Sequence, residues 1–304
     1  MTTTATVPQA EARRRSNRTA AGEAHRLLPR PLLVTVTVIL CAMVVIPTSY
    51  IVLASLNTDI GVAEGQFWPS TFSVDSYTKI WTTANLATGL FNSILVCAFV
   101  AVFSALLGTI TAYVLVRFTF TGRLTILRGL VGLQSIPGTL MLLPVFVLYA
   151  SAGNYLGVQV IGTRWGLGIA YLTFALPFST WVMVTYLRGL PRELEEAGRM
   201  DGAGTVTILF RIIVPLSLPA IVVSAIFAFL LGWNDVLFAS VLTRPETQTA
   251  AVALSIFATT QEGGALPVYS QVMAAALVTA APVVLLYLVF QRYLVGGLTA
   301  GGVK

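Results

Sequence analysis

The sequence is poor in charge. Only 10% of its 304 residues are Asp, Glu, Lys or Arg, whereas about 25% is usual for a soluble globular domain. Hydrophobic residues make up 56% of the chain. So few charged side chains cannot cover the surface of a soluble fold of this length. The composition therefore excludes a cytosolic enzyme, a disordered chain and a nucleic-acid-binding domain.

Residues that catalysis or metal binding would require are also scarce. Neither Lys79 nor Lys304 follows the glycine-rich run of a phosphate-binding loop, so the chain is not expected to hydrolyse ATP. Its one histidine is His25, and its two cysteines, Cys41 and Cys97, both lie in apolar runs. A metal site, a Ser–His triad and a disulfide framework therefore lack the necessary residues. We expect no catalytic residue, no metal and no cofactor in this chain.

Long apolar runs, by contrast, are abundant. A helix needs about 20 apolar residues to cross a hydrocarbon core of about 30 Å. Six segments meet this requirement and predict an all-α polytopic protein with six transmembrane helices. They are Leu32–Leu53, Phe91–Val116, Leu130–Tyr149, Leu167–Leu187, Leu218–Phe238 and Val272–Leu294. Prolines interrupt the third and fourth segments, at Pro137, Pro144 and Pro177.

The distribution of basic residues predicts the orientation of these helices. If the N-terminus is cytoplasmic, only Lys79, Arg164 and Arg244 of the 18 Lys and Arg residues fall in outer segments. Cytoplasmic segments carry an excess of Lys and Arg, so both termini are expected in the cytoplasm. Two outer segments, 57–89 and 239–271, are long and suggest that something docks on the outer side. Inert cover would also account for them.

A polar segment between the fourth and fifth predicted spans has the pattern of a short helix. Pro191 precedes it, and acids at positions 193, 195 and 196 suit the positive end of a helix dipole. One helical face carries Leu194, Ala197, Gly198 and Asp201. This face is too small and polar for lipid, but it fits a protein cleft at close range. Gly202 and Gly204 are expected to end the helix and turn the chain.

The segment resembles the cytoplasmic EAA loop of type I ABC-importer permeases, in which E-A-A-x-x-x-D-G-A precedes an apolar stretch and L-P. Here Gly198 replaces the second Ala of that pattern. In the family this loop, residues 191–217 here, holds the coupling helix, which sits in a cleft of a cytoplasmic ATPase subunit. The resemblance implies that the coupling residues are Glu195, Glu196, Ala197, Gly198, Asp201, Gly202 and Ala203. A solvated acidic loop is the alternative.

Two further motifs resemble the carbohydrate branch of that family, specifically the maltose/trehalose-type second permease subunit. They are Trp233-Asn234-Asp235 and the stretch from Phe290 to Gly301. The resemblance implies four kinds of contact: a second permease subunit, two cytoplasmic ATP-binding subunits that hold ATP and Mg, an extracytoplasmic sugar-binding protein, and membrane lipid. It implies a non-catalytic permease of a di- or oligosaccharide importer in the bacterial inner membrane. An importer of an amino acid, phosphate or polyamine and, as a different class, a secondary transporter are the alternatives.

Asp235 is the one acid within the predicted spans. A carboxylate there costs about 2–3.5 kcal/mol if it faces lipid, so it is expected to face the helix bundle. Three roles are open. It caps a helix break or joins two permease subunits; it lies near the translocation path with Trp233 and Asn234; or it reaches outer water.

The predicted organisation has four parts. Residues 1–30 form a basic cytoplasmic tail that attracts anionic lipid and is not expected to bind nucleic acid. Residues 31–87 contain the first transmembrane helix and an outer loop. Residues 88–292 form the type I ABC permease (MetI-like) core, and residues 293–304 form a cytoplasmic tail that its glycines keep flexible.

Overall fold

The computed structural model describes residues 29–262 and 268–300, and all regular structure within them is helical. The all-α prediction is therefore confirmed. The chain divides into two compact units, residues 1–53 and 54–304. The first holds most of α2 (Arg30–Ser55), whose apolar side chains are largely exposed, as a lipid-facing helix requires. Most of the predicted basic tail, residues 1–28, lies outside the described residues.

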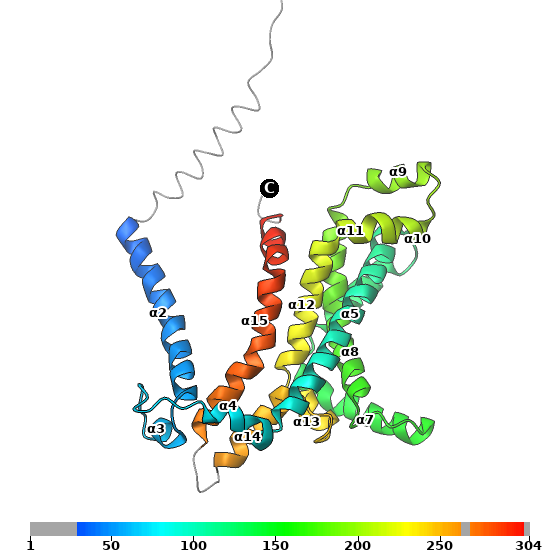
Figure 1. The fold of residues 1–304 in the computed structure, drawn as a ribbon. Helices are drawn as coiled ribbons and strands as arrows, with labels where there is room; N and C mark the ends of the chain where they lie inside the picture. Colours follow the sequence, from blue (N-terminus) through cyan, green and yellow to red (C-terminus); the bar gives the residue numbers. More distant parts are fainter. Residues whose placement is uncertain (1–28, 263–267, 301–304) are drawn as a thin grey trace, which may run out of the picture. The chain divides into compact units, whose positions relative to one another are not determined.

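Three helices form the centre of the second unit (Figure 1): α5 (Leu86–Arg117), α8 (Arg164–Arg188) and α12 (Leu218–Asn234). Small residues bring them close together. A β-carbon added at Gly108 of α5 would lie only 2.9 Å from Ser179 Cβ of α8. Close backbone approach of this kind favours packing between helices in a membrane, where hydrophobicity alone does not drive association. A fourth long helix, α15 (Tyr269–Ala300), packs against α12.

The number of membrane spans depends on how one bent pair of helices is counted. Five described helices are long and apolar enough to cross a membrane, and there are six if the bent pair forms one span. That pair consists of Thr205–Leu216 and Leu218–Asn234, which meet at 77°. Pro215 and Pro219 flank the bend. Each removes a backbone N–H donor, so the bend follows from the sequence.

The predicted bounds of the third and fifth spans are wrong. Instead of one helix over residues 130–149, the chain forms α6 (Arg123–Leu133) and α7 (Gly138–Leu156). Pro137 has an extended backbone with ψ of 127° and disfavours helix at the residue before it, which separates the two. The fifth span ends at Asn234, and α13 (Leu237–Leu242) begins after a short break.

In their described residues, the outer segments predicted as long loops contain short helices: α3 (Asp59–Ala63), α4 (Asp75–Thr83), most of α13, and α14 (Ala250–Glu262). Figure 1 places α4, α13 and α14 at one end of the central bundle, opposite to α9 (Glu193–Met200). Side-chain hydrogen bonds join α5, α8 and the segment before α14 at the end of the bundle opposite α9. Asn92 Nδ2 donates to the carbonyls of Glu246 and Gln248, and Arg164 Nε donates to Asn92 Oδ1 at 2.6 Å.

The C-terminal tail also differs from the prediction. Helix α15 continues to Ala300, so residues 293–300 are helical rather than a flexible extension, and residues 301–304 lie outside the described part. The C-terminal part of α15 lies at the same end of the unit as α9 (Figure 1). This arrangement agrees with the predicted cytoplasmic position of both segments.

Candidate functional site

The coupling segment forms the short helix that the sequence predicts, α9. Acids occupy its first turn and Arg199 its last, which suits both ends of the helix dipole. After the helix ends, Gly202 adopts a φ of +81°, in the left-handed region. The Ala203 N–H donates to the Gly198 carbonyl at 2.9 Å, which closes the turn. The turn at Gly202 thus needs a residue that tolerates positive φ.

Gly204 plays a different part from Gly202. Its φ is −73° and its backbone is extended, so any residue can adopt its conformation. It precedes α10 (Thr205–Ile208), which continues through the π-helical turn η1 (Leu209–Ile213) and α11 (Val214–Leu216) towards α12. Residues 205–216 are thus helical up to the bend at Ser217.

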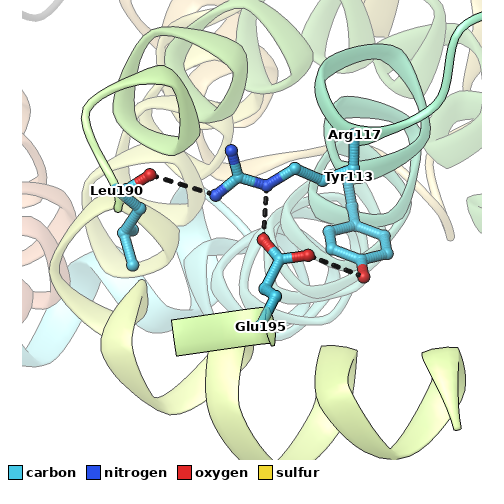
Figure 2. A network of polar contacts seen from close by, with 4 residues as sticks. All are labelled: Tyr113, Arg117, Leu190 and Glu195. Atoms are coloured by element: carbon cyan, nitrogen blue, oxygen red, sulfur yellow. Dashed lines mark hydrogen bonds and ion pairs between the residues drawn. The ribbon is translucent and has the colours of Figure 1, made fainter. Parts of the chain in front are cut away.

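The acids of α9 lie in two environments. Glu196 is exposed, whereas Glu195 is only 4% exposed. The Glu195 carboxylate forms an ion pair with Arg117 Nε and accepts a hydrogen bond from Tyr113 Oη at 3.2 Å (Figure 2). Arg117 Nη2 in turn donates to the Leu190 carbonyl at 3.2 Å. Two neighbouring acids of one motif therefore differ, because Glu195 is buried against α5 and Glu196 is exposed.

This network joins α9 to the central helices. Arg117 is the last residue of α5, and Leu190 follows the C-terminal end of α8. Both side chains of the ion pair are about 5% exposed. Removing one partner of a buried ion pair costs about 3–5 kcal/mol because the other charge stays buried and unpaired. The ion pair therefore ties α9 directly to the end of α5.

Gly198 also faces its own chain. A β-carbon there would lie 2.8 Å from Ile212 Cδ1 and 3.4 Å from Ile208 Cγ1, so the helix packs on η1 and α10 without a side chain between them. The docking face predicted from the sequence therefore loses Gly198. Its other members, Leu194, Ala197 and Asp201, are exposed. The departure from the family pattern at Gly198 corresponds to a close internal contact.

Asp235 caps a helix break. Its Oδ2 accepts hydrogen bonds from Tyr171 Oη at 2.8 Å and from the backbone N–H of Ala239 at 3.0 Å. Ala239 lies in the first turn of α13, where backbone N–H groups lack helical partners. The carboxylate thus holds α13 against α8 across the break after Asn234. This geometry fits the first of the three roles considered for Asp235.

Asn234 and Asp235 also line a cavity of about 700 Å³. Trp233 does not share this position. It is 5% exposed, stacks on Phe229 with ring centroids 5.2 Å apart and belongs to a buried cluster with Cys97. Of the three residues predicted near the translocation path, the structure therefore brings two to a cavity and places the third in packing.

Tyr113 and Arg117 were missed by reasoning from the sequence. A signal existed, because they are four residues apart at the end of a predicted span and so lie on one helical face. Nothing in the sequence paired them with Glu195, which is distant along the chain. Among the residues that the structure describes, no group of three or more His, Cys, Asp and Glu could hold a metal ion.

Comparison with known proteins places the chain in a family. A family model described as "Binding-protein-dependent transport system inner membrane component" matches residues 104–299. The trehalose transport system permease protein SugB of Mycobacterium tuberculosis is 32% identical over 260 residues, 85% of this chain and 92% of that protein. The alpha-glucoside transport system permease protein AglG of Rhizobium meliloti is 34% identical over 237 residues, 78% of this chain. That match spans 61% of AglG, less than two thirds of its length.

The fold is also similar to that of a solved transporter chain. A bacterial ABC transporter involved in the import of the acidic polysaccharide alginate superimposes with a TM-score of 0.72 at 22% identity. The alignment covers 88% of this chain and 99% of that chain. The chain therefore belongs to the family of binding-protein-dependent transport inner-membrane components, and it is a multi-pass permease subunit of an ABC importer in the bacterial inner membrane.

Proposed function

We propose that this permease serves an ATP-driven importer of a di- or oligosaccharide, forms half of its translocation pathway and couples to a cytoplasmic ATPase. The observation that carries the proposal is the buried Arg117–Glu195 pair, which fastens the coupling helix to a central span. A helix outside the membrane that is rigidly joined to a span is what mechanical coupling requires. The relatives named for trehalose and alpha-glucoside transport support a saccharide as the solute.

The surface around α9 supports a docked cytoplasmic partner. Four large apolar side chains are exposed there: Leu194, Met200, Val206 and Phe210. Met200, at the end of α9 just before the turn at Gly202, is 88% exposed. Large apolar side chains exposed on neighbouring short helices favour an interaction site at this end of the bundle. Acids beside these apolar side chains, such as the exposed Glu196, would form a polar rim around the docking surface.

The full assembly contains more than this chain. We propose a heterodimer with a second permease subunit, two ATP-binding subunits that hold ATP and Mg, and an extracytoplasmic sugar-binding protein. A solved alginate importer, which is similar in fold at a TM-score of 0.65, is in complex with a periplasmic protein that carries an alginate pentasaccharide. The cavity beside α8 and α12 is where a second subunit would complete the wall of a translocation pathway.

The mechanism follows from one rigid element with two positions. ATP binding closes the two ATPase subunits, and α9 moves with the cleft that holds it. The Arg117–Glu195 pair passes this displacement to α5, and the packed spans change access from the outer to the cytoplasmic side. Nucleotide binding to the ATPase subunits thus shifts the equilibrium between the outward-open and the inward-open arrangement of the spans. This chain transfers no chemical group.

Uptake into proteoliposomes tests the proposal. The importer, assembled from this chain and its co-expressed partners, is supplied outside with the binding protein and labelled trehalose or maltose. We expect sugar uptake with MgATP enclosed and none with a non-hydrolysable analogue. Uptake driven by an ion gradient without ATP would favour a secondary transporter. Uptake of an amino acid, phosphate or polyamine in place of both sugars would contradict the choice of solute.

A further inference from the structure

Helices α6 and α8 together line two cavities. The α8 side chains that line them, called the groove face, include Thr173, Phe178, Trp181, Thr185 and Arg188. The part near Thr173 lines the cavity of about 700 Å³, together with the ends of α6 and α12. The part near Thr185 lines a second cavity of about 400 Å³ between α6 and α8. The two cavities therefore follow each other along the same helix face, towards its cytoplasmic end.

The cavity of about 700 Å³ near Thr173, called the outer cavity, carries negative charge and hydrogen-bonding groups. Asp235 is the one charged residue among those that line it. Both hydrogen bonds of its carboxylate go to Oδ2, so no described residue donates to Oδ1. Gln134 and Asn234 add amide groups, and Phe178 adds an aromatic ring. Apolar walls with a few converging polar groups are typical of a small-molecule site.

Two breaks in helical structure border this outer cavity. One lies between α6 and α7, next to Gln134, and the other lies between α12 and α13, at Asp235. At membrane depth, irregular backbone is tolerated only where it is buried in protein or lines a water-filled cavity. Broken helices are also where transporters place solute sites. The two breaks therefore favour a water-filled cavity over a crevice filled by lipid.

The cavity of about 400 Å³ near Thr185, called the inner cavity, carries positive charge. Arg128 and Arg188 line it, and no acid does. Neither arginine has an ion pair or hydrogen bond with another described residue. Trp181, whose side chain is 46% exposed, lies between the two charged ends on α8. A cleft lined by one sign of charge repels mobile ions of that sign.

We propose that this face of α8 is a single solute groove whose outer half is negative and whose inner half is positive, and that it admits an uncharged saccharide better than a charged one. The proposal rests on the proposed function for the identity of the solute. Asp235 disfavours an anionic sugar in the outer half. Arg128 and Arg188 disfavour a cationic sugar in the inner half. The hydroxyls of a neutral sugar bond to carboxylate and guanidinium alike.

Thr173 and Thr185 provide a matched pair of positions for the test. Both are exposed, and each hydroxyl donates to the backbone carbonyl four residues earlier. Thr173→Cys and Thr185→Cys are made separately in a Cys41→Ser background, because Cys41 is exposed whereas Cys97 is fully buried. The importer assembled with its partner chains is placed in lipid nanodiscs. Cationic, anionic and neutral methanethiosulfonate reagents of similar size then report the local charge at each thiol.

We expect the cationic-to-anionic rate ratio to be about fivefold or more higher at Thr173→Cys than at Thr185→Cys, since the charges that line the two cavities differ in sign and act oppositely on the two reagents. Asp235→Asn should remove the bias at the first position only. The pair Arg128→Gln and Arg188→Gln should remove it at the second only. Equal ratios at both positions would overturn the proposal.

Two thiols that resist all three reagents in the assembled importer would also overturn it, since the groove would then be a contact between subunits. The experiment measures no transport. A failure of sugar uptake would therefore reject the proposed function while the charge of the groove is measured separately. Conversely, normal sugar uptake with no difference in charge between the two thiols would reject the groove proposal alone.

Discussion

Replacing Gly202 by Leu is expected to abolish uptake by the assembled importer while the chain stays in the membrane at its normal level. Gly202 has a φ of +81°, which costs a residue with a β-carbon about 1–2 kcal/mol. No other atom lies within 4 Å of the added β-carbon, so internal packing is not disturbed. The loss of function then comes from the altered turn after α9 and from the docking surface beside it.

Gly204→Leu is the matched control for this substitution. Gly204 is also exposed, and a β-carbon added there would meet no atom within 4 Å, but its φ is −73°. Uptake rates and membrane levels of both variants are measured together. We expect Gly204→Leu to retain much more uptake than Gly202→Leu. Uptake by Gly202→Leu at the wild-type rate would remove the coupling role from this turn.

The substitution Glu195→Ala is expected to lower the free energy of unfolding by about 3–5 kcal/mol, because it leaves Arg117 buried without its partner. Glu196→Ala, one residue away on the exposed side, should change it by about 0–1 kcal/mol. Denaturant titration of the purified chain in mixed micelles measures both. The same free energy for the two variants would contradict the buried network.

A double variant separates the fold from the coupling. Replacing Arg117 by Met and Glu195 by Leu removes both charges, and apolar replacement of a buried ion pair is often neutral for stability. We expect this variant to recover most of the lost stability. In the assembled importer, Glu195→Ala should hydrolyse ATP with less sugar taken up per ATP, because α9 is no longer fastened to α5. An unchanged ratio of uptake to hydrolysis would show that the pair only stabilises the fold.

The sequence was sufficient for those features that depend on local physical chemistry. Long apolar runs predict membrane helices, and the acids after Pro191 together with Gly202 predict a short helix and its turn. The bounds of the third and fifth spans were wrong because hydropathy does not register where Pro137 or the cap at Asp235 breaks a helix. Each break is only a few residues long and apolar sequence resumes after it, so averaged hydropathy bridges both breaks although the helix ends there.

Features that depend on tertiary contacts were out of reach. Glu195 and Glu196 are chemically identical neighbours, and only the position of α5 decides that Glu195 meets Arg117. Gly198 was expected on the docking face, but packing on η1 turns it inward. The cavity that holds Asn234 draws its lining from several separate helices, so no single stretch of sequence announces it.

The area of α9 limits what the coupling helix can do alone. A helix of eight residues buries much less than the roughly 800 Å² per partner of a standard protein interface. The ATP-binding chain should therefore be held jointly by α9, neighbouring cytoplasmic residues and the end of α15. Glu196→Ala is expected to weaken its retention only in part, because an exposed charge contact contributes about 0–1 kcal/mol. Combining Glu196→Ala with deletion of residues 296–304 should release it far more.

Co-purification of an ATP-binding chain with the tagged permease, co-expressed with its partners and extracted in mild detergent, tests the central claim most directly. We expect the wild-type chain to retain it, the single variant to retain part of it and the combined variant to retain very little. If the wild-type chain never retains an ATP-binding chain under these conditions, the account of this permease as half of an ATP-driven importer is contradicted.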